Sequence, residues 1–389
     1  MLPVLVFFFS FLFVNGIANL YGDKKRSSAF QTFSCLIILI VFFACRDLPI
    51  LNDTSHYYGY MWKTINIYGY HDYSIWDNVY KTKFEYGFLI WSRIIAKYIS
   101  NDAYSLIFIT AIIQSIFIVY FVRIYNREKI ALTIFFLTSF CLMFYAAMRQ
   151  GYAMMFFLIG YRMLEKGKNI LWYFVCVGIA FMFHQSAILT IFFPILLRVR
   201  PLKRAIIVTV FCALLMAVFI YPLLEEAGMD ESIYYRTNLK RSTFPLAAVL
   251  NVLLNLFFIL LSIWLWKTYK VKNAPRGLVW SWVITLCYGI ISVPFLIFGR
   301  VVAYWQIFIP IGLVYMYIKA KENISCNLSG RVVSYSHKKM SPEMILMIAF
   351  VVYVAQFMVI LLMKNEWYHL VPYSFYDFKP GLHNFHFGY

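Results

Sequence analysis

The chain has 389 residues, of which 62% are hydrophobic and only 13% are charged, and its formal net charge is +18. So small a polar fraction cannot cover a water-soluble globule of this size, which excludes a soluble protein and indicates an integral membrane protein. The positive charge indicates membrane topology and contact with anionic lipid headgroups, and nucleic-acid binding is not predicted.

Apolar runs long enough to cross a membrane recur along the chain and predict α-helices. The first run, 2–20, has no Lys or Arg before it and no small-residue cleavage pattern, so we expect a retained span and not a removed signal peptide. Further runs lie at 29–45, 104–122, 130–147, 150–164, 170–197, 205–222, 244–266, 278–298, 302–319 and 342–363. None has the alternating pattern of a membrane β-barrel, so the predicted class is all-α and polytopic.

The loops between these runs fall into two classes by charge. Six loops together hold 21 of the 35 Lys and Arg residues, and they lie at 21–28, 123–129, 165–169, 198–204, 267–276 and 319–339. The positive-inside rule places these loops in the cytoplasm. Segments 46–84 and 223–243 have nearly balanced charges, so we expect them outside.

Two stretches do not fit a simple crossing. The run 170–197 is long for one helix and short for two crossings at about 1.5 Å per residue, so we expect two short helices that meet near His184 on the outer side. Segment 84–99 carries Glu85, Arg93 and Lys97 and is expected to lie in the outer interface or to re-enter the membrane. Together, the apolar runs and the loop charges predict one membrane domain, 1–389, with about twelve spans (11–14) and both termini outside. It includes an outer loop at 46–103 and an outer aromatic tail at 364–389.

A few ionisable residues lie at the ends or breaks of apolar runs: Arg46, Asp53, Glu85, Arg149, His184 and Arg300. The topology was derived from the loops alone, yet it places all six at the outer face. Arg149 and Arg300 interrupt apolar sequence, where a buried cation is costly unless an anion pairs with it. Each could snorkel to the interface or bind an anionic ligand. Gly299 predicts a helix break just before Arg300.

The other ionisable residues also have two interpretations. His184 could be a buried core histidine or a ligand-binding group. Asp53 begins Asp-Thr-Ser, which is turn and helix-cap chemistry, and it could equally serve as a catalytic carboxylate. Glu85 could cap a helix, pair with Lys83 or Arg93, or take part in catalysis.

The outer loop is dense in Tyr and Trp. Its aromatic residues are Tyr57, Tyr58, Tyr60, Trp62, Tyr68, Tyr70, Tyr73, Trp76 and Tyr80. They could form an interfacial belt or a platform for the C–H faces of sugars. The sequence contains no Gly-rich phosphate loop, HExxH or paired CxxC, so we expect no nucleotide, metal or other cofactor.

The predicted site therefore combines arginines, a histidine and two carboxylates at the outer face. The planar fork of arginine suits phosphate oxygens, as in a lipid diphosphate headgroup. A nearby carboxylate can take a proton from an attacking sugar hydroxyl.

These residues occur in an ordered series of short motifs. The series is Arg46-x6-Asp53-Thr54-x2-Tyr57, Glu85-Tyr-Gly-Phe, Arg149 with Ala153, Phe183-His184-Gln-Ser186-Ala187, Arg300 with Tyr304, and Pro372-Tyr373. It covers most of the chain and resembles the EpsG-like family of Wzy-type polysaccharide polymerases, which build O-antigen and exopolysaccharide in bacteria.

The resemblance implies a GT-C-like, metal-independent glycosyltransferase in the bacterial inner membrane, with its active site facing the periplasm. Such an enzyme moves a growing glycan from undecaprenyl diphosphate onto a new lipid-linked repeat unit, with inversion at the anomeric carbon. Its partners would be the undecaprenyl-diphosphate-linked oligosaccharide, the lipid bilayer and a chain-length regulator.

The implied roles assign Asp53 as first choice and Glu85 as second choice of general base. Diphosphate binding is assigned to Arg149, Arg300, His184 and, more weakly, Arg46. Substrate contacts are assigned to Tyr57, Trp62 and Tyr304.

Three other functions were weighed. A lipid-linked oligosaccharide flippase would tend to place polar groups at mid-membrane and to show two related halves, and neither feature is visible in the sequence. An O-antigen ligase would devote a large outer domain to its acceptor, whereas the outer segments are short. A membrane acyltransferase would need a His-Asp pair, and His184 has no carboxylate near it in sequence.

Overall fold

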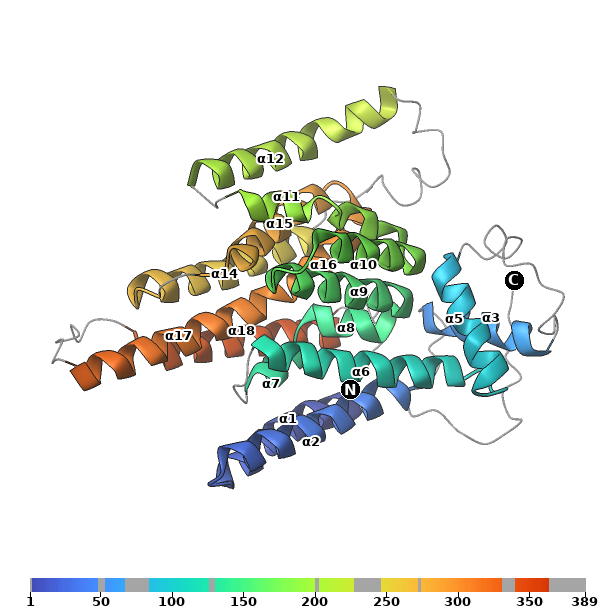
Figure 1. Cartoon of the computed structure of the whole chain (residues 1–389), viewed down its shortest axis with the longest axis horizontal. Helices are drawn as coiled ribbons and strands as arrows, with labels where there is room; N and C mark the ends of the chain where they lie inside the picture. The colour runs from blue at the N-terminus through green and yellow to red at the C-terminus, as the bar shows by residue number, and fades with distance from the viewer. Residues whose placement is uncertain are drawn as a thin grey trace. The chain divides into compact units, whose positions relative to one another are not determined.

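The computed structural model of the chain describes residues 2–47, 53–66, 84–125, 130–199, 203–226, 246–271, 274–330 and 340–363. Over these ranges the chain folds into α-helices and one 3₁₀ helix joined by short connections, with no β-strand (Figure 1). The all-α class predicted from the sequence is confirmed.

Six helices in the described ranges are long and apolar enough to cross a membrane. They cover Leu2–Leu20, Lys25–Ala44, Ser105–Tyr125, Leu246–Thr268, Phe298–Ser325 and Pro342–Leu362. The chain is therefore a multi-pass membrane protein. Shorter apolar helices lie between these segments, and the expected count of about twelve spans and the GT-C-like architecture stay predictions.

The chain divides into two compact units. The first contains Met1–Phe156, Val175–Gln185 and Tyr353–Tyr389. In it α1 (Leu2–Leu20) packs along α2 (Lys24–Ala44), and α2 packs along α6 (Ser105–Tyr125) (Figure 1).

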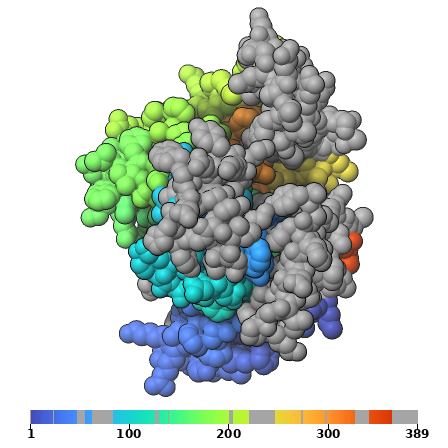
Figure 2. Space-filling model, turned by 90° about the vertical axis from the view of Figure 1, so that its right-hand side faces the viewer, coloured from blue at the N-terminus to red at the C-terminus, as the bar shows by residue number. Residues whose placement is uncertain are grey.

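The first unit also contains four shorter helices. They are α3 (Asp53–Asn66), α5 (Tyr86–Tyr98), α7 (Ile130–Phe136) and α8 (Ser139–Ala146). Helices α3, α5 and α6 contact one another, and part of α3, drawn in light blue, is visible on the face shown in Figure 2.

The second unit contains Phe157–Phe174 and Ser186–Val352. Its helix α15 (Arg276–Ser292) contacts α12 (Lys203–Glu226), α14 (Leu246–Thr268) and α16 (Leu296–Gln306), and α14 also packs against α17 (Phe308–Gly330). Helices α9 (Met148–Glu165), α10 (Ile170–Phe183) and α18 (Pro342–Met363) contribute residues to both units.

Residues in the basic loops determine where several helices begin and end. Asp23 caps α2, because its carboxylate accepts a hydrogen bond of 2.8 Å from the backbone N–H of Lys25. Gly167 follows α9 with a φ of 68°, a left-handed conformation that glycine adopts without steric cost. The Asn169 side chain then accepts from the N–H of Leu171 and starts α10.

The break predicted near His184 is confirmed. Helix α10 ends at Phe183, a 3₁₀ helix covers Gln185–Thr190, and a short helix α11 covers Phe193–Arg198. Segment 84–99, which is expected to lie in the outer interface or to re-enter the membrane, contains helix α5, whose 13 residues span about 20 Å, less than the ~30 Å of a bilayer core.

Two local predictions were wrong. The run 130–147 is not one helix, because Thr138 interrupts it and its hydroxyl accepts from the Cys141 N–H at 3.3 Å, which caps α8. Gly299 does not break a helix, because α15 ends before Pro294, which lacks the N–H to continue it, and Gly299 lies inside α16. At Asp53, where the sequence left turn and helix-cap chemistry open, helix α3 begins.

Candidate functional site

The joint between α8 and α9 places Arg149 at the start of a helix. Helix α8 ends at Ala146, Ala147 has a non-helical backbone, and α9 begins at Met148. Arg149 is thus the second residue of α9. The break that the sequence predicted at this arginine is confirmed, two residues earlier in the chain.

Arg149 forms an ion pair with Glu85 across 64 positions of sequence. Its Nη1 donates to Oε2 of Glu85 at 2.5 Å, and its Nε donates to the hydroxyl of Tyr57 at 3.3 Å. The guanidinium also lies over the ring of Phe84, with Cζ 4.8 Å from the ring centroid. The side chains of Arg149 and Glu85 are 15% and 12% exposed, so the pair is largely shielded but still reaches the surface.

The carboxylate of Glu85 is free to pair because it does not cap its own helix. Glu85 occupies the N-cap position of α5, yet its side chain makes no capping hydrogen bond. Its backbone carbonyl accepts from Phe88 and Leu89 instead. Of the alternatives raised by the sequence, helix capping by the side chain is therefore excluded, and the partner is Arg149.

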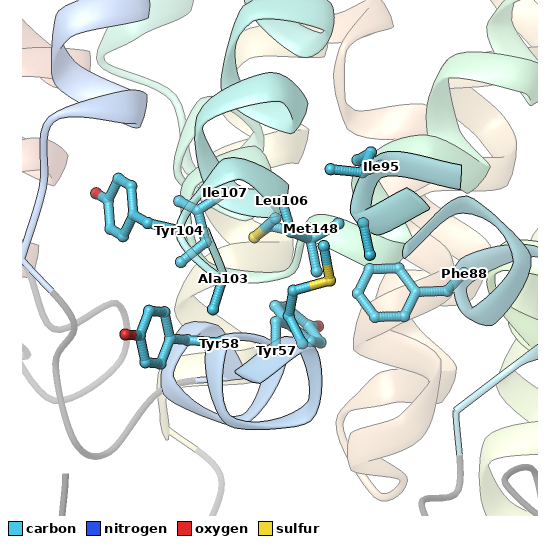
Figure 3. Close-up of a cluster of buried hydrophobic side chains, with 11 residues drawn as sticks. Tyr57, Tyr58, Phe88, Ile95, Ala103, Tyr104, Leu106, Ile107 and Met148 are labelled. Carbon is cyan, nitrogen blue, oxygen red and sulfur yellow. The ribbon is translucent and has the colours of Figure 1, made fainter. Parts of the chain in front are cut away.

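Tyr57 is held in a buried hydrophobic cluster beneath the ion pair. Figure 3 shows Tyr57 and Tyr58 of α3 beside Phe88 of α5 and Met148 of α9. The Tyr57 side chain is 1% exposed, and its ring lies 5.0 Å from that of Phe88. Burial of these side chains fixes α3 against α5 and leaves the Tyr57 hydroxyl at the cluster edge to accept from Arg149.

The start of α5 packs closely against the chain just before His184. A Cβ added to Gly87 would lie 2.8 Å from the carbonyl oxygen of Met182, so only glycine allows this approach. Phe183 packs against Tyr152 of α9, with ring centroids 5.0 Å apart. His184 follows directly and is half-buried, and its N–H closes the last turn of α10. Gly87 belongs to the motif Glu85-Tyr-Gly-Phe, and the motif alone does not predict this role.

Arg46 is buried away from solvent, with 2% of its surface exposed. Its Nη1 donates to the backbone carbonyl of Tyr145, and its Cζ lies 4.1 Å from the centroid of the Tyr145 ring. Arg46 therefore contacts the end of α8, and its link to Arg149 runs through the backbone of the joint.

Gln114, a buried polar residue in the apolar helix α6, contacts the start of α9. Its side chain donates to the Met148 carbonyl at 3.0 Å, and the sequence did not predict this role.

A second set of predicted residues lies in the other compact unit. Tyr304 is fully buried, and its hydroxyl lies 3.2 Å from the hydroxyl of Ser186. Arg300 lies one helical turn before Tyr304 on α16 and is exposed. Both Ser186 and Tyr304 belong to the predicted motifs, and the structure brings them together.

The two remaining predicted residues lie on α3. The backbone of Asp53 begins the helix, and its side chain falls outside the described residues. Trp62 is 38% exposed, whereas Tyr57, Tyr58 and Tyr60 are buried. The outer tail 364–389 and residues 67–83, with the other loop aromatics, also lie outside the described residues.

Comparison with known proteins identifies the family. The model of the EpsG family matches residues 30–375, which is most of the chain. No match was found among curated proteins or among solved structures. The chain belongs to the EpsG family, which is linked to exopolysaccharide synthesis.

Proposed function

We propose that this member of the EpsG family is a polysaccharide polymerase. It would be a glycosyltransferase that moves a growing glycan from undecaprenyl diphosphate onto a new lipid-linked repeat unit at the periplasmic face of the inner membrane. The observation that carries the proposal is the shielded Arg149, held by Glu85 and Tyr57 within a chain of this family.

The geometry around Arg149 suits a diphosphate leaving group. A guanidinium has five N–H donors in a plane, and the bonds to Glu85 and Tyr57 engage two of them. The other donors can form a bidentate contact with phosphate oxygens. In a shielded site such contacts stabilise the negative charge that develops on the leaving oxygen more strongly than they would in water.

The two carboxylates take different roles in this proposal. One oxygen of Glu85 is engaged by Arg149, which supports a role in orienting the arginine. Asp53 then remains the first choice of general base, accepting the proton of the acceptor hydroxyl while that oxygen attacks the anomeric carbon. Direct displacement breaks the bond between the anomeric carbon and the diphosphate oxygen and inverts this carbon, and departure of undecaprenyl diphosphate supplies the energy.

Other predicted residues also have roles in this proposal. Arg300 is assigned to the diphosphate, and Tyr304 with Ser186 would set the position of α16 and the exposed Arg300. His184 would donate to the diphosphate or to a sugar hydroxyl. Trp62, which is exposed on α3, would contact the glycan.

The direct test is polymerisation by the purified full-length protein. It is supplied with a defined undecaprenyl-diphosphate-linked repeat unit, and the products are separated by length. A ladder of glycans with inverted linkages is expected, together with release of undecaprenyl diphosphate. Movement of the lipid-linked unit across vesicles without any ladder would instead identify a flippase, and transfer only to lipid A core would identify a ligase.

A labelling experiment tests the periplasmic orientation. A cysteine replacing Ser232 lies in the charge-balanced loop 223–243, and one replacing Asn273 lies in the basic loop 267–276. Both positions fall outside the described residues. In spheroplasts, a membrane-impermeant thiol reagent should label the first variant above the wild-type background and not the second. The opposite pattern would place the proposed site in the cytoplasm.

A further inference from the structure

Two buried side chains hold the joint between α8 and α9 from different helices. Arg46, at the end of α2, donates to the carbonyl of Tyr145 and stacks on its ring. Gln114 of α6 donates to the carbonyl of Met148 at 3.0 Å. The two carbonyls lie on either side of Ala147, where the backbone leaves α8 and enters α9.

The end of α8 needs such a partner because a helix end leaves its last carbonyls without intrahelical hydrogen bonds. Tyr145 lies in the last turn of α8 and is 2% exposed, so water has little access to its backbone carbonyl. A cation at a helix C-terminus is also favoured by the helix dipole. Arg46 supplies both the donor and the charge.

The two side chains are themselves fixed by the fold. The hydroxyl of Tyr104 bonds to the backbone carbonyls of Ala44 and Arg46 and secures the chain that carries the guanidinium. Gln114 is 1% exposed and its amide lies against Gly151, where an added Cβ would overlap Nε2. A side chain at position 151 would therefore displace the Gln114 amide.

We propose that Arg46 and Gln114 are positioning residues for Arg149. They fix the first turn of α9, and so they set the guanidinium toward Glu85 and Tyr57 before substrate binds. Arg46 then acts through the joint and does not contact the diphosphate. The identity of the ligand rests on the proposed function, whereas the contacts of Arg46 and Gln114 with the joint do not.

Hydrogen exchange tests the joint directly, without any ligand. The full-length protein in nanodiscs is compared with Arg46→Met, Gln114→Leu and the conservative Arg46→Lys. Amides of residues 145–151 should exchange about 10-fold faster in the Met and Leu variants, because opening of the joint is less costly, and should return toward wild type in the Lys variant. The matched control is Gln31→Leu, which removes an equally buried amide on α2 that bonds to Arg123. Unchanged exchange at 145–151 in both test variants, or equal acceleration in the Gln31 control, would overturn the proposal.

A double-mutant cycle separates positioning from ligand contact. Affinity for undecaprenyl diphosphate is measured for Arg46→Met in the wild-type and Arg149→Met backgrounds. Arg46→Met should weaken binding about 10-fold in the first background and less than about 2-fold in the second, because residues that act through one another are not additive. Equal losses in both backgrounds would show that Arg46 contacts the diphosphate itself, and the positioning role would be wrong. If wild type does not bind this lipid, the proposed function fails while the exchange result still decides the joint.

Discussion

Replacing Arg149 with Lys separates the effect of charge from the effect of the planar fork. The ammonium group of Lys can still reach toward Glu85, because it extends from the same backbone position at the start of α9. It cannot donate in fixed directions to Glu85, Tyr57 and a diphosphate at once, as the guanidinium can. The variant therefore keeps the local positive charge and loses the bidentate contact.

The expected loss follows from the number of hydrogen bonds removed. A hydrogen bond to a charged group contributes about 1.5–3 kcal/mol, so loss of one phosphate contact should lower kcat/KM about 10- to 150-fold. The folded protein loses only the 3.3 Å bond to Tyr57 and part of the contact with Phe84. Its stability should fall by about 0.5–1.5 kcal/mol.

The assay compares initial polymerisation rates of purified variants on the defined lipid-linked repeat unit, with thermal unfolding measured on the same samples. Arg162→Lys is the matched control, since Arg162 lies at the far end of the same helix and also pairs with a glutamate, Glu165. It should polymerise at the wild-type rate. If Arg149→Lys makes glycan of normal length at the normal rate, the bidentate contact with the diphosphate is refuted, because positive charge alone would then be sufficient.

Four further substitutions test the rest of the site. Arg300→Lys should also polymerise poorly at normal expression, and normal ladders would remove Arg300 from the diphosphate contact. Asp53→Asn should lower the rate about 10²-fold or more, because Asn caps a helix as well as Asp but cannot accept the proton. Glu85→Gln should have the smaller effect of the two, and the reverse order in the rate assay would make Glu85 the base. Gly87→Ala should destabilise the protein by about 1–3 kcal/mol in thermal unfolding, because the backbone carbonyl of Met182 stands 2.8 Å from the new Cβ; an unchanged melting temperature would contradict the close packing.

The sequence predicted most of the features that depend on local composition. Apolar runs predicted the helices, and the polar residues within those runs located the breaks at His184 and before Arg149. These predictions succeed because each apolar segment in lipid must form its backbone hydrogen bonds within itself, so its own composition determines that it is helical. Thr138 was missed because a single threonine in an apolar run is a weak cap signal until its hydroxyl is seen to bond.

The partners of the charged residues could not be predicted in the same way. Glu85 and Arg149 lie 64 positions apart, and the sequence suggested Lys83 or Arg93 as partners because they are close along the chain. The pairing depends on the packing of α3, α5 and the start of α9, which buries Tyr57 and Phe88 together. The role of Gln114 could not be predicted for the same reason, because its hydrogen bond to Met148 forms only where α6 packs against the joint.

Both members of the ion pair lie at helix starts, because Glu85 precedes α5 and Arg149 is the second residue of α9. Helix starts carry unpaired N–H groups and a positive end of the dipole, so they favour anions even without side chains. The contacts of Arg149 with Glu85 and Tyr57 bring the starts of α5 and α9 together with α3. A diphosphate bound there would meet the guanidinium in a field already favourable to negative charge. The arginine would also neutralise the carboxylate of Glu85, which would otherwise repel the diphosphate.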